Sequence, residues 1–134
     1  MLARIVWGLC LLSPMAASAK SGVCDNPVNN VAEMECMSAE IGNAEAKLER
    51  YLATAKKRVA RDDTIRLNLD TAQNAWQAYR KAQCGDVYDY WGMASYRHSA
   101  SAQCTLELTR QRTLDIWSAY LTFVDSTPPV LPKP

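Results

Sequence analysis

The fold is decided by the stretch Gln73-Asn74-Ala75-Trp76-Gln77-Ala78-Tyr79-Arg80-Lys81-Ala82-Gln83-Cys84, which places an aromatic pair, an arginine and a cysteine on one helix. Its apolar side chains continue a stripe with alternating spacings of four and three residues, which is the period of an amphipathic helix. The stripe comprises Ile65, Leu69, Ala72, Trp76 and Tyr79. The pattern predicts a helix over residues 64–83.

Two more amphipathic segments flank this helix. Residues 28–61 place their apolar side chains on one face at about 100° per residue, and acidic residues near the start with basic residues at the end complement the helix dipole. Residues 99–124 carry a wider apolar face, as expected of a helix that touches two neighbours. The short turn Asp62-Asp63-Thr64 predicts that the first two helices are antiparallel neighbours. The expected fold class is all-α, an up-down-up three-helix bundle.

The ends of the chain are expected to lie outside this domain. A single positive charge at Arg4, an apolar run and the small residues Ala17-Ser18-Ala19 are typical of a secretory signal peptide, which predicts cleavage after residue 19. The apolar run is shorter than the roughly 20 residues of a membrane-spanning helix, so no stable membrane anchor is expected. The proline-rich residues 126–134 predict a disordered tail. The helical domain would therefore occupy residues 20–125.

The balance of charge argues against a polyanionic partner that is recognised by the net charge of the chain. The full chain has 15 basic and 14 acidic residues, and the predicted signal peptide removes only Arg4. The remaining chain is nearly neutral, so no global field would steer it to nucleic acid or to an anionic membrane. Electrostatic recognition must then be local.

The four cysteines outside the predicted signal peptide indicate two disulfides at one end of the bundle. An even number in a small exported chain is typical of disulfides. A zinc site is disfavoured because no pair has C-x-x-C spacing and His98 is the only histidine. Three pairings of Cys24, Cys36, Cys84 and Cys104 are possible. Cys36 points about 140° away from the apolar face of its helix, which favours Cys24–Cys36 with Cys84–Cys104.

Residues 85–98 are the best candidate for a binding loop. Two glycines and weak periodicity predict a loop between the second and third helices, and its residue types are those that dominate binding hot spots. The alternative is that the same rings fold back to cover the end of the bundle. The candidate binding residues are Asp86, Tyr88, Asp89, Tyr90, Trp91, Tyr96 and Arg97.

Polar side chains on the apolar faces predict a structural cluster. A buried Glu45 would need a cation, and helix rise places Gln73 and Arg112 at a similar depth. The expected cluster pairs Glu45 with Arg112, with Gln73 in support and Arg80 one turn nearer the cysteines. A catalytic role for Glu45 is disfavoured because no nucleophile, second carboxylate or metal ligand accompanies it. With no nucleophile-elbow, phosphate-loop or zincin motif, we expect no enzyme, no metal and no cofactor.

The motif residues resemble those of the LprI lysozyme-inhibitor family, whose members are small exported bacterial proteins. The resemblance rests on Glu33-Met34-x-Cys36, on Gln73-x-x-Trp76-x-x-Tyr79-Arg80-x-x-x-Cys84, on Gly92 and on Cys104-x-x-x-Leu108-Thr109-x-x-Arg112. It implies a helical, disulfide-bonded domain that in some members binds and inhibits lysozyme.

Two functions follow as hypotheses. The first is a periplasmic or secreted protein that blocks a lysozyme-type muramidase by steric occlusion, with the 85–98 loop as its contact surface. The alternative is a non-catalytic structural or assembly module of the cell envelope that binds another exported protein. Both require a protein partner.

Overall fold

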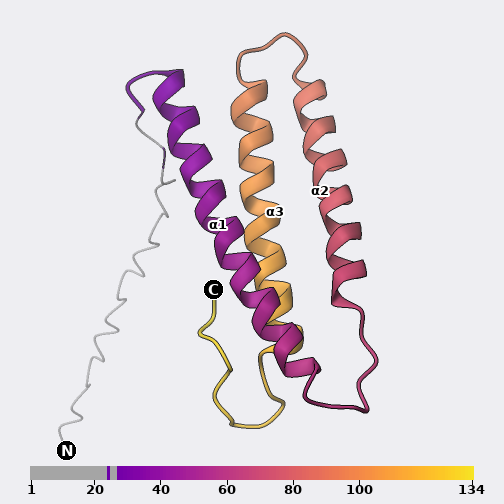
Figure 1. Cartoon of the computed structure of the whole chain (residues 1–134). Coiled ribbons are helices and arrows are strands. Elements are labelled where there is room, and N and C mark those ends of the chain that lie inside the picture. Colours follow the sequence, from indigo (N-terminus) through magenta and orange to yellow (C-terminus); the bar gives the residue numbers. More distant parts are fainter. Residues whose placement is uncertain (1–23, 25–26) are drawn as a thin grey trace, which may run out of the picture.

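The computed structural model describes Cys24 and residues 27–134, which form an up-down-up bundle of three α-helices (Figure 1). The helices are α1 (Asn30–Val59), α2 (Leu69–Tyr90) and α3 (Arg97–Tyr120). No strand occurs among these described residues, and none of their helices is both long and apolar enough to cross a membrane. The predicted all-α three-helix bundle is confirmed. The expected signal peptide, residues 1–19, lies outside the described part of the chain.

The third helix, not the second, is the immediate neighbour of α1. α3 lies between α1 and α2 and packs along both (Figure 1), as its wide apolar face predicts. The outer helices meet mainly through side chains, including an ion pair between Lys56 and Asp70. The prediction that α1 and α2 are direct neighbours is therefore wrong for most of their length. Their connection is longer than the predicted turn and allows α3 to lie between them.

The start of α2 differs from its predicted position because its cap lies further along the chain. The Asn68 side chain accepts a hydrogen bond from the Thr71 amide (3.0 Å) and caps the helix. Asp62 instead accepts hydrogen bonds from the amide (2.9 Å) and hydroxyl (2.6 Å) of Thr64, which closes a local turn. The connection consequently extends over residues 60–68, and Ile65 lies outside the helix.

The end of α2 corrects the prediction of a loop over residues 85–98. Helix α2 continues through Gly85 to Tyr90, and the true connection to α3 is only residues 91–96. A glycine inside a helix costs only about 1 kcal/mol, so Gly85 does not end it. Gly92 does, because its φ of +52° lies in the left-handed region that glycine adopts freely after a helix. The amide of Gly92 donates to the Asp89 carbonyl (3.0 Å).

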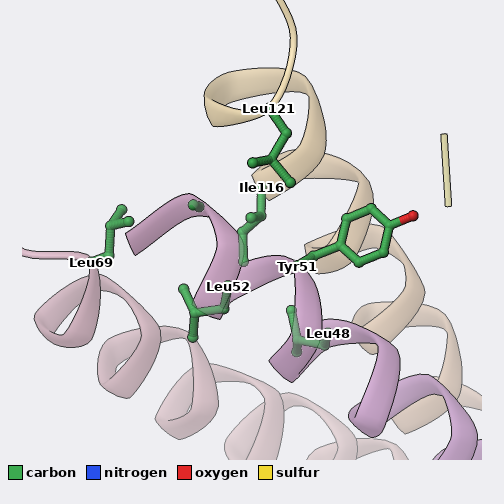
Figure 2. Close-up of a cluster of buried hydrophobic side chains, with 7 residues drawn as sticks. Leu48, Tyr51, Leu52, Leu69, Ile116 and Leu121 are labelled. Carbon is green, nitrogen blue, oxygen red and sulfur yellow. The ribbon is translucent and has the colours of Figure 1, made fainter. Parts of the chain in front are cut away.

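Two apolar clusters make up the core, and a polar layer separates them. The cluster nearer the cysteines comprises Met37, Ala44, Ala102 and Leu106. The larger cluster comprises Leu48, Tyr51, Leu52, Ala55, Leu69, Ile116 and Leu121 (Figure 2). Between them, α3 contributes the fully buried Thr109 and Thr113, whose hydroxyls donate to backbone carbonyls one turn earlier (2.7 and 3.0 Å). In the described part of the chain, every buried side-chain nitrogen and oxygen has a hydrogen-bond partner.

The C-terminal segment is ordered against the bundle, contrary to the predicted disordered tail over residues 126–134. After α3 the chain turns and runs back beside α1 (Figure 1). The Trp117 indole donates to the Leu131 carbonyl (2.9 Å), and the Leu131 side chain packs on the larger apolar cluster. Proline prevents this segment from forming a helix, but a segment without helical structure can still pack against the bundle. The Leu131 side chain and the main chain of residues 130–132 supply the contacts.

Candidate functional site

Both disulfides lie at the end of the bundle where α2 meets α3. Cys24 is bonded to Cys36, with a Cα–Cα distance of 5.9 Å, and Cys84 to Cys104, with 5.6 Å. The favoured pairing is thus confirmed. Cys84 is buried, and its carbonyl also accepts a hydrogen bond from the Ser101 hydroxyl (2.9 Å). The second bridge and this hydrogen bond hold the last turns of α2 against the first turns of α3.

Four large side chains at this junction face solvent and form what we term the aromatic surface. Its members are Tyr90, Trp91, Met93 and Tyr96. Tyr90 is 83% exposed and Tyr96 is 55% exposed. The rings stack edge to face, with centroid distances of 5.7 Å from Tyr90 to Trp91 and 4.9 Å from Trp91 to Tyr96. The rings pack on one another and do not fold back over the core.

A second group of side chains joins the last turn of α2 to the first turn of α3. Tyr88 is half-buried and lies edge to face with His98 at 5.2 Å. The guanidinium of Arg97 lies over the Tyr88 ring at 4.6 Å and donates to the Gly92 carbonyl (2.8 Å). Of the predicted binding residues, Tyr88 and Arg97 therefore brace the connection. The other five, Asp86, Asp89, Tyr90, Trp91 and Tyr96, are exposed.

Four carboxylates lie at the same end of the bundle as the aromatic surface. Asp86 and Asp89 are exposed on the last two turns of α2. Glu33 and Glu35 lie at the start of α1, at the same end of the bundle (Figure 1). Sequence reasoning missed these two glutamates as part of the candidate surface, since they belong to a different helix. Only the order of the helices brings them to this end of the bundle.

The predicted polar cluster has a different pairing from the expected one. Arg80 reaches from α2 to Glu45 on α1 (Nη1–Oε1, 2.9 Å), and the same nitrogen donates to the Thr109 hydroxyl (2.7 Å). Arg112 instead donates from Nε to the Gln73 side chain (3.2 Å). The expected Glu45–Arg112 pair is therefore wrong. Although α2 lies on the far side of α3, Arg80 reaches Glu45 because its long side chain crosses the polar layer beside Thr109.

Trp76 is the centre of this cluster. The guanidinium carbons of Arg80 and Arg112 lie 4.9 Å and 5.9 Å from its ring centroid. Cation–π attraction and hydrogen bonds therefore fix both arginines against one ring. Tyr79, which sequence reasoning placed on the buried stripe, is 53% exposed. The buried face of α2 follows Leu69, Gln73 and Cys84 instead.

The other polar features lie away from the aromatic surface. A cavity of about 330 Å³ opens at the connection between α1 and α2, where Lys56, Arg66 and Leu67 are among its lining residues, and none of the predicted site residues line it. Hydrogen bonds from Thr64 hold the pKa of Asp62 below its usual value. Within the described residues, no three His, Cys, Asp or Glu side chains are grouped to hold a metal ion.

Exposed stacked rings, with exposed carboxylates on the last turns of the preceding helix, suit the recognition of a protein surface. Large rigid aromatic side chains contribute contact area with little loss of conformational entropy, and bordering charges select the partner and speed association. The short connection and the Cys84–Cys104 bridge hold these rings in place before binding. Such preorganisation raises affinity because less freedom is lost.

Comparison with models of protein families identifies a match over most of the described chain. The family model described as "Lysozyme inhibitor LprI" matches residues 24–116, which span the chain from the first bridged cysteine to the last turns of α3. Comparisons with curated proteins and with solved structures return no match. The matched region contains both disulfides, the polar layer and the aromatic surface.

Proposed function

We propose that the chain, which belongs to the LprI lysozyme-inhibitor family, is a periplasmic or secreted protein that binds a lysozyme-type muramidase and blocks it by steric occlusion. It has no catalytic role in this proposal. Two disulfides fit an oxidising compartment outside the cytoplasm. The expected signal peptide supports the same location.

The observation that carries the proposal is the exposure of the aromatic surface at a disulfide-closed end of the bundle. A monomeric domain gains nothing from leaving Tyr90, Met93 and Tyr96 in water, whereas a binding interface uses such residues as its energetic centre. Asp86 and Asp89 lie beside them and would meet basic residues of the muramidase. The rigid helices behind this surface would then keep the substrate away from the enzyme.

The first test measures inhibition directly. The oxidised protein is added at micromolar concentration to a purified lysozyme that is clearing a suspension of bacterial cell walls, and the turbidity is followed. We expect the wild type to slow the clearing. Tyr96→Ala should weaken inhibition about thirtyfold, since hot-spot truncations cost on the order of 2 kcal/mol. If the wild type has no effect at micromolar excess over a panel of lysozymes, inhibition is excluded.

A matched control separates the aromatic surface from exposed aromatics in general. Tyr79 is 53% exposed, nearly the same as Tyr96, but lies in the middle of α2. Tyr79→Ala should therefore leave inhibition unchanged. Equal losses in both variants would place the interface elsewhere.

A second matched pair of variants tests the role of charge. Asp89→Asn removes a carboxylate beside the aromatic surface, and Asp63→Asn removes one at the opposite end of the bundle. Only Asp89→Asn should lower the association rate, with the difference shrinking as salt increases. If the chain captures another envelope protein in a pull-down but binds no lysozyme, the result supports the assembly-module hypothesis.

A further inference from the structure

The C-terminal segment is held to the bundle as a bound peptide would be. We call residues 126–134 the strap and define its contact site as Tyr51, Trp117 and Leu121. Tyr51 comes from α1, Trp117 from α3, and Leu121 directly follows α3. Leu121 and Tyr51 belong to the larger apolar cluster, and the Tyr51 hydroxyl points away from that cluster (Figure 2). The contact site therefore combines an apolar floor with polar groups at its edge.

Three consecutive strap residues are contacted through their main chain. The amide of Val130 donates to the Leu121 carbonyl (2.8 Å). The carbonyl of Leu131 accepts from the Trp117 indole (2.9 Å), and that of Pro132 accepts from the Tyr51 hydroxyl (2.7 Å). Because these contacts use the backbone, they are tolerant of sequence. Selectivity comes from position 131, whose side chain packs on the apolar cluster.

The composition of the strap suits such binding. Proline has no amide hydrogen, so at Pro132 the only main-chain hydrogen-bonding group is the carbonyl that Tyr51 contacts. A residue that precedes proline is biased toward an extended backbone, which restricts Leu131 before it binds. Proline-containing segments docking against aromatic side chains are a recurring mode of peptide recognition, and their low conformational entropy is the physical reason.

We propose that Tyr51, Trp117 and Leu121 form a recognition site for extended segments in which an aliphatic residue precedes proline, and that the chain's own strap occupies this site. The site goes beyond the proposed inhibition. It uses other residues than the aromatic surface, and Trp117, Leu121 and the strap lie outside the region matched by the family model. The same segment supplied on a separate molecule competes with the attached strap for the site.

The test uses the full-length chain and a fluorescein-labelled peptide with the sequence of residues 126–134. Leu131→Asp in the protein detaches its own strap, because a carboxylate would be placed on the apolar cluster. Fluorescence anisotropy should show that the peptide binds this variant at least tenfold more tightly than the wild type, since the attached strap competes at an effective concentration of about millimolar. A peptide carrying the same Leu131→Asp change should not bind.

A second substitution tests the contact site itself. Tyr51→Phe, added to the Leu131→Asp protein, removes one hydrogen bond and should weaken peptide binding about three- to tenfold. Tyr79→Phe removes an exposed hydroxyl elsewhere and should have no effect. Should Leu131→Asp prevent folding, the milder Leu131→Ala replaces it, and accelerated exchange of the Trp117 indole N–H then reports release of the strap. Absence of peptide binding up to about millimolar concentration, or equal binding to wild type and variant, would overturn the proposal.

Discussion

Arg80 on α2 and Glu45 on α1 form an ion pair (2.9 Å) across the polar layer, although α3 lies between most of the two helices. The same Arg80 nitrogen donates to Thr109 on α3, so one side chain connects all three helices. Its exposure is 19%, whereas that of Glu45 is 44%. The two partners therefore contribute unequally: most of the stabilisation depends on Arg80.

Replacing Arg80 by Ala should lower the free energy of unfolding by about 2 kcal/mol. The change leaves the buried Thr109 hydroxyl without its donor and removes the contact with Trp76. Glu45→Gln should cost less than about 1 kcal/mol, since a half-exposed ion pair is screened by solvent. Chemical denaturation of the two variants measures both values. Equal costs would contradict the unequal roles inferred from their burial.

The two disulfides should contribute similarly to stability but differently to binding. They close loops with sequence separations of 12 and 20 residues, and loop-closure entropy gives about 3 kcal/mol for each. Replacing Cys84 and Cys104 by Ser should also weaken lysozyme inhibition, because this bridge holds the aromatic surface. Replacing Cys24 and Cys36 by Ser serves as the control with a matched loss of stability. If both double variants inhibit equally, the bridge beside the rings has no specific role.

Arg58 should act as a cap for the end of α3. Its guanidinium donates to the carbonyls of Tyr120 (2.7 Å) and Thr122 (3.0 Å) and lies over the Phe123 ring at 4.2 Å. Arg58→Ala should lower the free energy of unfolding by about 1–2 kcal/mol and speed amide exchange in the last turn of α3. Its exposed neighbour supplies the control, since Lys57→Ala should change stability by less than about 0.5 kcal/mol.

Tyr51→Phe should loosen the strap without disturbing the core. The ring stays in the apolar cluster, and only the hydrogen bond to the Pro132 carbonyl is lost. The expected loss of stability is about 1 kcal/mol. Amide exchange at Val130 should accelerate, while exchange in the middle of α3 should follow only the change in global stability. Unchanged exchange at Val130 would show that the hydroxyl does not hold the strap.

Acidification should release the local turn in which Asp125 accepts hydrogen bonds from Thr127, at the start of the strap. Hydrogen bonds from the Thr127 side chain and amide hold the pKa of Asp125 below its ordinary value of 3.8. A carboxyl with a lowered folded pKa contributes stability that is present above the unfolded value and is lost as pH falls through the folded value. The midpoint of the shift of the Thr127 amide resonance with pH should therefore lie below 3.8. Asp125→Asn, which does not titrate, should abolish the shift.

The sequence predicts the helices and bridges well because each depends on regular spacing. Apolar periodicity identifies all three helices, and the direction of Cys36 on α1 selects the correct disulfide pairing. The ends of the helices are less predictable, because in the sequence both Gly85 and Gly92 could end the second helix. Only the backbone shows that Gly92 alone adopts a positive φ.

Contacts between helices are not determined by spacing along each one. Helix rise places Arg112 at the depth of Glu45, but Arg80, one turn nearer the cysteines, is its partner in the folded bundle. The packing of the strap against the bundle was not predicted from the sequence, for a related reason. Its prolines exclude a helix, but Leu131 packs on side chains from α1 and α3 that are distant in sequence.

The central position of α3 has a consequence for the order of folding. The pairing of α2 with α3 is local, since a short connection and the Cys84–Cys104 bridge join them, whereas α1 must find α3 across a long intervening chain. Local contacts cost less loop-closure entropy and form earlier. We therefore expect the α2–α3 hairpin to form in the transition state and α1 to dock afterwards. Substitutions such as Ala55→Gly in α1 would then mainly speed unfolding and leave the folding rate nearly unchanged.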